Sequence, residues 1–314
     1  MRIARYERSG TSQPEGLAIA AAGGPFVDIN RAWLKLRNIS DAGDGEFLFS
    51  TSELISEGQY IWGLVDQLAL EAASDPELVV DDSAPGFRWL CPFDRIASLR
   101  DFLAFEDHVV RGAKRRDTEV PAYWYEAPVY YKGNHRALLG PDEPCSWPSY
   151  TNQLDFELEL AMVVGRRGRD IAVDAAADYI FGFTIFNDFS ARDVQARELT
   201  TWLGPAKGKD FANAFGPCIV TIDELGAEPD LEMICRVNDN EWGRGRSSTV
   251  RWSWADMIAH VSSAEEIYPG DIYGSGTPGG CCGLDLGREL APDDIVELEI
   301  ENIGILRNQI VRSS

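Results

Sequence analysis

Two glutamates in the stretch LDFELELAMVVG, residues 154–165, are the first candidates for chemistry. Apolar and acidic residues alternate there, and this period of two predicts a strand on which Glu157 and Glu159 point the same way. Same-face neighbours on a strand lie about 6.5–7 Å apart, so the two carboxylates repel each other unless water or a cation lies between them. The simpler alternative is an edge strand with a solvated acidic face.

A third carboxylate, Asp188, follows an apolar strand predicted at 181–186, about thirty residues after the glutamates. A strand–helix–strand connection of that length would return the chain beside the first strand, so that the three carboxylates could converge. A site made of carboxylate oxygens prefers a hard cation such as Mg²⁺, Mn²⁺ or Ca²⁺ over zinc. Taken alone, Asp188 could equally be a turn or helix-cap residue.

The segment DFLAFEDH, residues 101–108, adds a carboxylate and a histidine. If residues 102–108 are helical, His108 lies two turns from Asp101 on nearly the same face. Histidine has an unperturbed pKa of about 6.5 and could act as a general base on water near a metal ion. The alternative is a packed or surface histidine, which is how we interpret His135 and His260.

The elements that would position these residues follow from hydrophobic periodicity and turn residues. Residues 75–90 are rich in Asp, Pro and Ser and are interpreted as a domain connection, and prolines break residues 120–150 into loops that could wrap a site. The remaining predicted elements are strands at 2–6, 16–21, 26–29 and 296–300, a turn at Gly23-Gly24, and helices at 59–73, 174–179 and 255–262.

Composition limits the possible partners and the redox state of the chain. The 314 residues carry a formal charge of −22, which argues against nucleic acid or an anionic membrane as partner. We find no signal-like segment and no apolar run of membrane-spanning length, and we expect a soluble, cytoplasmic protein. The six scattered cysteines are expected to be reduced, and three histidines make a zinc site rich in His or Cys improbable.

Four stretches together resemble the fumarylacetoacetate hydrolase family. They are LDFELELAMVVG, FGFTIFNDFSARDVQARE, LGPAKGKDF and YPGDIYGSGTPGG, and the resemblance covers roughly residues 90–314. It implies that Glu157, Glu159 and Asp188 bind a divalent cation, most simply Mg²⁺. The larger members of the family add an aspartate ligand and, seven residues on, a catalytic histidine, which matches Asp101 and His108.

Further positions carry over one at a time. Arg192 and Gln195 match residues that face the substrate, and Lys209 matches the active-site lysine. Tyr131 resembles a substrate-contacting tyrosine, and Thr277 matches a contact to the substrate carboxylate. Each has a plainer alternative: Arg192 could pair with the neighbouring Asp193, and Lys209 could be a solvated loop charge.

The sequence departs from the family at two places. Where the family usually has a glutamate that orients the histidine, CCGLDLGR offers Asp285, which is one methylene shorter. The loop expected after His108, residues 111–116, is more basic than the family pattern and does not align. These differences leave the identity of the substrate open.

The resemblance implies an α+β fold: a small N-terminal domain, residues 1–85, and a mixed β-roll catalytic domain, residues 86–314. It further implies a homodimeric hydrolase that cleaves a carbon–carbon bond in a β-diketo acid, a reaction typical of the breakdown of aromatic compounds. A 2-oxoacid decarboxylase, tautomerase or hydratase would use the same site without attack by water. A metal-binding protein without catalytic activity is the third reading.

Overall fold

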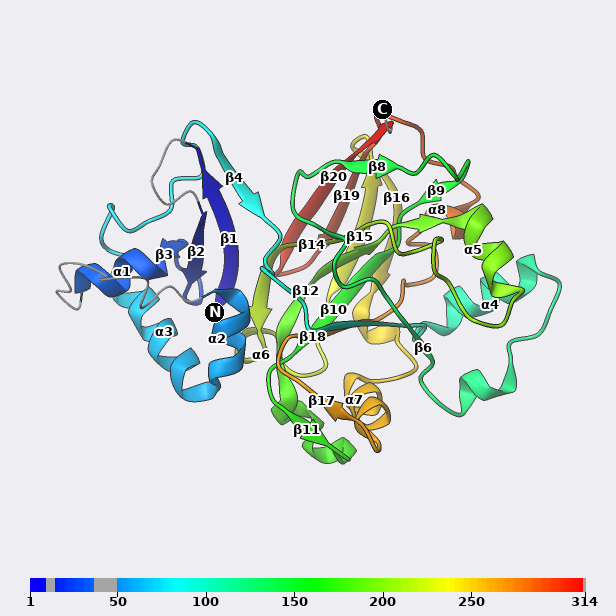
Figure 1. The fold of residues 1–314 in the computed structure, drawn as a ribbon, viewed down its shortest axis with the longest axis horizontal. Coiled ribbons are helices and arrows are strands. Elements are labelled where there is room, and N and C mark those ends of the chain that lie inside the picture. The colour runs from blue at the N-terminus through cyan, green and yellow to red at the C-terminus, as the bar shows by residue number, and fades with distance from the viewer. Residues whose placement is uncertain (10–14, 37–49, 313–314) are drawn as a thin grey trace.

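Two open sheets form the core of the protein in a computed structural model that describes residues 1–9, 15–36 and 50–312 (Figure 1). The larger sheet has eleven strands within these residues. In pairing order its strands are β3 (Val27–Asp28), β2 (Glu15–Ala20), β1 (Arg2–Arg8), β14 (Asn213–Thr221), β12 (Ile180–Asp188), β10 (Leu158–Val164), β18 (Asp271–Gly274), β5 (Ser98–Phe102) and β6 (Tyr130–Lys132), while β4 (Phe87–Leu90) pairs with β1 and β7 (Leu138–Leu139) with β14.

The second sheet packs near the C-terminal end of the chain (Figure 1). Its strands in pairing order are β16 (Asn240–Arg246), β15 (Glu232–Val237), β19 (Ile295–Ile300), β20 (Gly304–Arg312) and β8 (Cys145–Trp147). Two short pairs accompany the sheets: β11 (Gly168–Arg169) with β17 (Glu266–Ile267), and β9 (Leu154–Asp155) with β13 (Ser190–Ala191).

Short helices lie around the sheets and at their ends. They are α1 (Ile29–Leu36), α2 (Thr51–Glu57), α3 (Gln59–Ala72), α4 (Glu106–Arg115), α5 (Arg192–Leu199), α6 (Ile222–Leu225), α7 (Trp254–Ser262) and α8 (Gly283–Leu286), with 3₁₀ helices η2 (Ala122–Tyr125), η3 (Val173–Tyr179) and η4 (Ser247–Thr249). None of the helices in the described part of the chain has the length and apolar character needed to cross a membrane.

Strand β10 lies inside the large sheet, between β12 and β18, and every one of its residues is buried. The edge strand with a solvated acidic face is therefore wrong. Alternate residues of β10 face two different hydrophobic clusters. Leu160 and Met162 pack in one cluster with β15 and β19, while Ala161 and Val163 pack in another with α2 and α3. Because both faces are covered, any carboxylate on this strand must find a partner inside the protein.

The N-terminal segment has the predicted strands, and helix α3 matches the helix predicted at 59–73. Strand β1 pairs with β2 on one side and with β14 and β4 on the other, so the N-terminal strands extend the same sheet that contains β10. Strand β4 begins inside the predicted connection 75–90. The division into domains 1–85 and 86–314 remains a prediction.

Asp101 and His108 do not share a helix, and this prediction was wrong. Asp101 lies in β5, where it pairs with Gly274 of β18 and Tyr131 of β6, and the helix α4 begins only at Glu106. Of the apolar residues between them, Phe102 ends the buried strand β5, Ala104 and Phe105 are buried beyond it, and Leu103 is exposed. The expected basic loop 111–116 is largely the last turn of α4, where cationic side chains suit the helix C-terminus.

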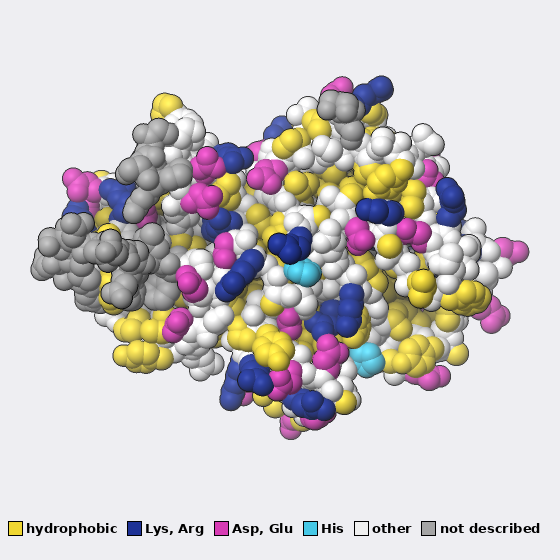
Figure 2. Space-filling view, in the orientation of Figure 1, with side chains coloured by type: hydrophobic (Ala, Val, Ile, Leu, Met, Phe, Trp, Pro, Cys, Tyr) yellow, Lys and Arg dark blue, Asp and Glu magenta, His cyan; other side chains and the backbone are white. Residues whose placement is uncertain are grey.

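The remaining elements match their predictions closely. Strand β12 contains the predicted strand 181–186 and ends at Asp188, α7 covers the predicted helix 255–262, and β19 covers 296–300. The predicted helix 174–179 is the 3₁₀ helix η3. All six cysteines are free and buried. On the face drawn in Figure 2, the described Lys and Arg side chains are interspersed with Asp and Glu.

Candidate active site

Three buried carboxylates meet at the ends of neighbouring strands. Asp101 comes from β5, Glu159 from β10 and Asp188 from β12, and one oxygen from each lies within 4.8 Å of the others. Their exposed fractions are 5%, 0% and 0%. Gly274 of β18 faces this group without a side chain, and the backbone N–H of Gly276 donates a hydrogen bond of 2.9 Å to Oε2 of Glu159.

The three carboxylates are incompletely satisfied by the protein. Among the described residues, no hydrogen-bond partner reaches Oδ1 of Asp101, Oε1 of Glu159 or Oδ1 of Asp188. Burial, with the charge of Asp188, raises the pKa of Asp101 well above its usual value, and burial with the charge of Asp101 does the same for Glu159. Buried carboxylate oxygens without donors are the ligands that a hard divalent cation takes, so the residues fit such an ion.

Lys209 lies beside this cluster and is only 2% exposed, so the solvated loop charge is wrong. Its ammonium forms salt bridges with Glu157 and Asp188. Burial alone would lower the pKa of Lys209, but the charges of Asp188 and Glu157 raise it. The hydroxyl of Tyr131 donates a hydrogen bond of 2.9 Å to Oδ2 of Asp188. Both side chains therefore present donors at the rim of the carboxylate group.

Arg192, in the first turn of α5, joins two acidic residues. Its Nη2 donates to Oε1 of Glu157 at 2.9 Å, and its Nε to Oδ2 of Asp155 at 2.8 Å. Its Nη1 also donates to Oε1 of Gln195 at 3.1 Å. The alternative pairing with Asp193 is wrong, because that carboxylate bonds to residues 151 and 152 instead.

Glu157 differs from the other predicted metal ligands. Burial alone would raise its pKa, but the charges of Arg192, Lys209 and His108 hold that pKa well below its usual value. It is therefore a charged carboxylate with cationic partners, and it lies outside the group of three. Its role as a metal ligand remains a prediction, whereas the structure brings Asp101, Glu159 and Asp188 together.

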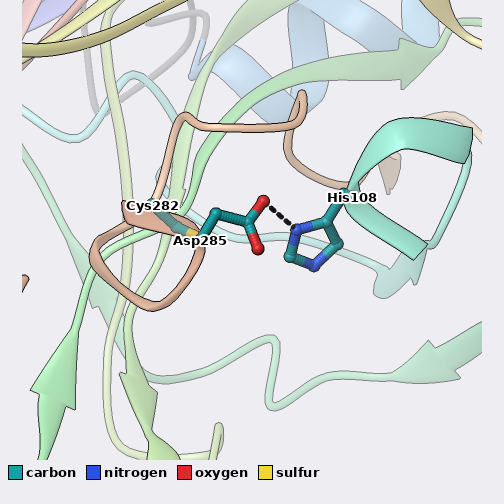
Figure 3. Close-up of side chains that lie close together, drawn as sticks. All are labelled: His108, Cys282 and Asp285. Atoms are coloured by element: carbon teal, nitrogen blue, oxygen red, sulfur yellow. Dashed lines mark hydrogen bonds and ion pairs between the residues drawn. The ribbon is translucent and has the colours of Figure 1, made fainter. Parts of the chain in front are cut away.

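His108 reaches the site from the first turn of α4 (Figure 3). Its Nδ1 lies 2.8 Å from Oδ2 of Asp285, and its Nε2 lies 3.8 Å from Oε1 of Glu157. Asp285 also accepts hydrogen bonds from Arg115 Nη1 at 2.8 Å and from the backbone N–H of Gly280 at 3.1 Å. Burial would raise the pKa of Asp285, but its hydrogen bond and charge interaction with His108 lower it.

This geometry defines a histidine held by a carboxylate on one nitrogen. With Asp285 accepting from Nδ1–H, the lone pair of the neutral imidazole is on Nε2, the nitrogen that lies 3.8 Å from Glu157. That arrangement suits proton removal from water bound near the carboxylate group. Asp285 thus holds Nδ1 of His108, and its role as the orienting acid remains a prediction.

Thr277 is buried in the loop that follows β18, and its hydroxyl donates to the carbonyl of Cys281 at 3.2 Å. The same loop reaches Glu159 through Gly276. A contact of Thr277 to substrate remains a prediction. His135 and His260 are exposed and lie outside the groups of candidate metal ligands found among the described residues.

The sequence reasoning missed three side chains. Asp155 accepts from Arg192 and from the backbone N–H groups of Gly283 and Leu284 at 2.8 and 2.9 Å, and so ties α8 to the site. Its place in the same alternation as the glutamates was a usable signal. Arg115 and Cys282 were also missed, and no motif marks them because their roles depend on distant segments folding together.

The fold and the carboxylate group define a class: an α+β protein with a candidate site for a divalent cation. The sequence model of the fumarylacetoacetate (FAA) hydrolase C-terminal family matches residues 98–311. The chain therefore belongs to this family. The α+β fold expected from the resemblance is confirmed.

Two curated relatives have different activities. The 2,4-didehydro-3-deoxy-L-rhamnonate hydrolase of a Sphingomonas species is 32% identical over 213 residues, which are 66% of this chain and 70% of the relative. The mitochondrial oxaloacetate tautomerase of Rattus norvegicus is 31% identical over 215 residues, 67% of this chain and 64% of the relative. The family thus includes hydrolases and tautomerases.

Two solved structures share the fold. The fumarylacetoacetate hydrolase of Exiguobacterium antarcticum has a TM-score of 0.74 at 26% identity, and the match covers 100% of both chains. The fumarylpyruvate hydrolase of Pseudomonas aeruginosa, solved in complex with Mn²⁺ and pyruvate, has a TM-score of 0.61 at 20% identity, and the match covers 69% of this chain and 91% of that one. At that identity, the second comparison supports the fold alone.

Proposed function

We propose that this protein is a divalent-cation-dependent hydrolase that cleaves a carbon–carbon bond in a β-diketo acid, an acylpyruvate or a fumarylacetoacetate-like compound. The observation that carries the proposal is the pair formed by His108 and Asp285, because such a pair supplies a general base for water. The curated hydrolase among the relatives supports the same reaction class.

Asp101, Glu159 and Asp188 would hold the cation, with Glu157 as the fourth expected ligand. When bound, a Mg²⁺ or Mn²⁺ ion would be chelated by neighbouring carbonyl oxygens of the substrate and would polarise those carbonyl groups. The three oxygens without hydrogen-bond donors support this assignment. Mg²⁺ is our first expectation, and Mn²⁺ and Ca²⁺ also suit a set of oxygen ligands.

The protein's own groups would move the protons. Nε2 of His108 accepts a proton from water as the water oxygen bonds to the carbonyl carbon, and Asp285 holds the other ring nitrogen and stabilises the imidazolium that forms. The bond between this carbon and its neighbour then breaks, which gives a carboxylic acid and an oxo acid: a 2-oxoacid from an acylpyruvate and a 3-oxoacid from a fumarylacetoacetate-like compound. The departing carbon receives a proton from Lys209 or from the imidazolium.

The remaining site residues would position the substrate. Lys209 and Tyr131 present donors beside Asp188, and preorganised donors of this kind stabilise negative charge as it develops. Arg192 and Gln195 form one hydrogen-bonded unit at the start of α5 and would face the substrate together. Thr277 is expected to contact the substrate carboxylate.

A tautomerase, decarboxylase or hydratase is the second candidate function, and the rat relative named as an oxaloacetate tautomerase favours it. These reactions would use the same carboxylates and Lys209. The tautomerase and decarboxylase reactions do not need His108 to activate water, and a hydratase adds water to a carbon–carbon double bond and not to a carbonyl. A panel of acylpyruvates and oxaloacetate, assayed with Mg²⁺ or Mn²⁺, separates the candidates. Cleavage to two acids supports the hydrolase, whereas loss of the enol absorbance without cleavage supports the tautomerase.

A homodimer that acts on small oxo acids in the cytoplasm remains our prediction for assembly, partner and location. The dimer is implied by the family resemblance, and the apolar residues of β12 are already buried inside the protomer. Light scattering at micromolar concentration tests the assembly, and a monomer there would contradict it.

A further inference from the structure

A second group of candidate ligands is formed by His108, Cys282 and Asp285, which lie close together (Figure 3). Single ligand atoms of His108, Cys282 and Asp285 lie within 4.8 Å of one another. Cys282 is 0% exposed and the Asp285 side chain is 0% exposed, while His108 is 12% exposed. The group is therefore built into the protein, and the imidazole edge connects it to solvent.

We propose that His108, Cys282 and Asp285 form a site for Zn²⁺, and that zinc bound there inhibits the enzyme. An imidazole, a thiolate and a carboxylate are three ligand types that zinc accepts in a tetrahedral site, with a water as the fourth ligand. A thiolate selects zinc strongly over Mg²⁺, which prefers oxygen. The inhibition, but not the binding, rests on the proposed function.

The distance between the histidine and aspartate ligand atoms suits a tetrahedral ion after a small adjustment, and the sulfur of Cys282 lies within 4.8 Å of a ligand atom of each. Bonds of about 2.0–2.1 Å to nitrogen and oxygen place these two ligand atoms about 3.3 Å apart in a tetrahedron. The Nδ1–Oδ2 distance between His108 and Asp285 is 2.8 Å, so the hydrogen bond must open by about 0.5 Å. The two side-chain torsions of Asp285 and the two of His108 provide this movement without a backbone shift.

Charges around the thiol act in both directions. Asp155, Glu157 and Asp285 surround Cys282 and favour a cation, while Arg192 opposes it and Arg115 is paired with Asp285. Burial raises the pKa of Cys282, so without a metal ion the thiol keeps its proton. Zinc displaces that proton, and its affinity for the site should rise with pH.

The choice of nitrogen explains why zinc would inhibit. Nδ1 is the nitrogen that faces Asp285, and its hydrogen bond leaves the lone pair of Nε2 free to accept a proton. When zinc occupies Nδ1, the neutral ring must carry its proton on Nε2, and no lone pair remains for water. The base is then switched off although the carboxylate group and its cation are untouched.

Cobalt(II) provides the direct test, because a thiolate ligand gives Co²⁺ a charge-transfer absorption in the near ultraviolet that carboxylates do not give. The wild-type protein should show this absorption and bind two Zn²⁺ ions per chain, one at each group. Cys282→Ser should lose the absorption and one ion. Cys281→Ser is the matched control, since its thiol is equally buried but lies beside Cys235.

Inhibition is measured with saturating Mg²⁺, each variant being compared with its own rate without zinc. Zinc should inhibit wild type and Cys281→Ser, and Cys282→Ser should need at least tenfold more zinc, which is the usual effect of losing a ligand. If Cys282→Ser does not fold, His108→Ala should lose the same cobalt absorption. An absent absorption in wild type, or one that persists without Cys282, overturns the site.

The two proposals fail in different ways. If no substrate is cleaved, the proposed function fails, but the cobalt absorption and the second zinc ion still test this site. If turnover is found and zinc inhibits wild type and Cys282→Ser equally, zinc acts at the carboxylate group, and the inhibitory site is refuted while the hydrolase stands.

Discussion

Gly274 and Glu159 face each other where β18 meets β10, with no room for a side chain between them. A Cβ at Gly274 would lie 2.7 Å from Oε2 of Glu159 and 2.5 Å from Oδ1 of Asp101. Real carbon atoms do not approach carboxylate oxygens so closely, so a methyl group here must push one of the two carboxylates away. The glycine thereby keeps the two carboxylates close enough to share an ion.

Gly274→Ala should therefore destabilise the protein by about 1–3 kcal/mol and weaken Mn²⁺ binding, because it displaces a ligand. Gly63→Ala in α3 is the control: a Cβ there meets nothing within 4 Å, and alanine in a helix should stabilise by about 0.4–1 kcal/mol. Chemical denaturation and Mn²⁺ titration measure both. Unchanged Mn²⁺ affinity in Gly274→Ala would mean that the ion binds elsewhere.

Glu157 and Glu159 should respond oppositely to neutralisation in the metal-free protein. Burial and the charge of Asp101 disfavour the ionised form of the Glu159 carboxyl. Glu159→Gln removes that carboxyl, so in the presence of chelator the variant should be at least as stable as wild type. Glu157→Gln removes the partner of Lys209 and Arg192 and should cost about 3 kcal/mol. Both should lower Mn²⁺ affinity and activity, and equal stability of the two variants would contradict this assignment.

Binding of the cation should release protons. The pKa values of Asp101 and Glu159 are raised in the metal-free protein, so these groups hold protons well above the unfolded pKa of about 4 and must lose them to bind an ion. Affinity should therefore rise with pH, and so should the stabilisation by Mn²⁺. Calorimetry in buffers of different ionisation enthalpy counts the protons, and binding without release would show that the carboxyls are already ionised.

His108→Ala should lower the rate of cleavage by about 10²–10⁴, the usual effect of removing a general base. It should retain Mg²⁺ or Mn²⁺ affinity at the carboxylate group and the spectral change on ligand binding, since neither needs the imidazole. His135→Ala is the control because that side chain is exposed. Near-normal turnover in His108→Ala would leave the tautomerase or decarboxylase as the better function.

Asp285→Asn should lower kcat by about tenfold or more with a smaller change in KM. The reason is that His108 loses its hydrogen bond to an ionised carboxylate. Asparagine can also donate to Nδ1, which would place the ring proton on the wrong nitrogen. Asp117→Asn is a matched control, since Asp117 is exposed just after α4 with φ of 52°, a conformation that asparagine tolerates. An unchanged kcat would remove Asp285 from the mechanism.

Much of the fold could be predicted because the strands are short and strongly patterned. The alternation around Glu159 located β10, and the apolar run before Asp188 located β12 with its terminal carboxylate. The same pattern did not show that both faces of β10 are buried, because an alternation of acidic and apolar residues looks alike whether its acidic face meets water or other carboxylates.

The wrong helix at 102–108 has a related cause. Asp101 and His108 were placed by helical spacing, whereas Asp101 belongs to a strand held by partners far away in the sequence, Gly274 and Tyr131. Pairings of this kind leave no local signal. The same applies to Cys282, whose backbone bridges to Glu157 across more than a hundred residues of chain.

The position of β18 also affects the order of events during synthesis. This strand lies between β5, which carries Asp101, and β10, which carries Glu159, and it is among the last strands of the large sheet to leave the ribosome. Until it inserts, β5 has no neighbour on that side, and Asp101 stays apart from Glu159 and Asp188, whose strands pair directly. A nascent chain that stops before Gly274 should have no high-affinity place for the ion, so the cation can be acquired only near the end of translation.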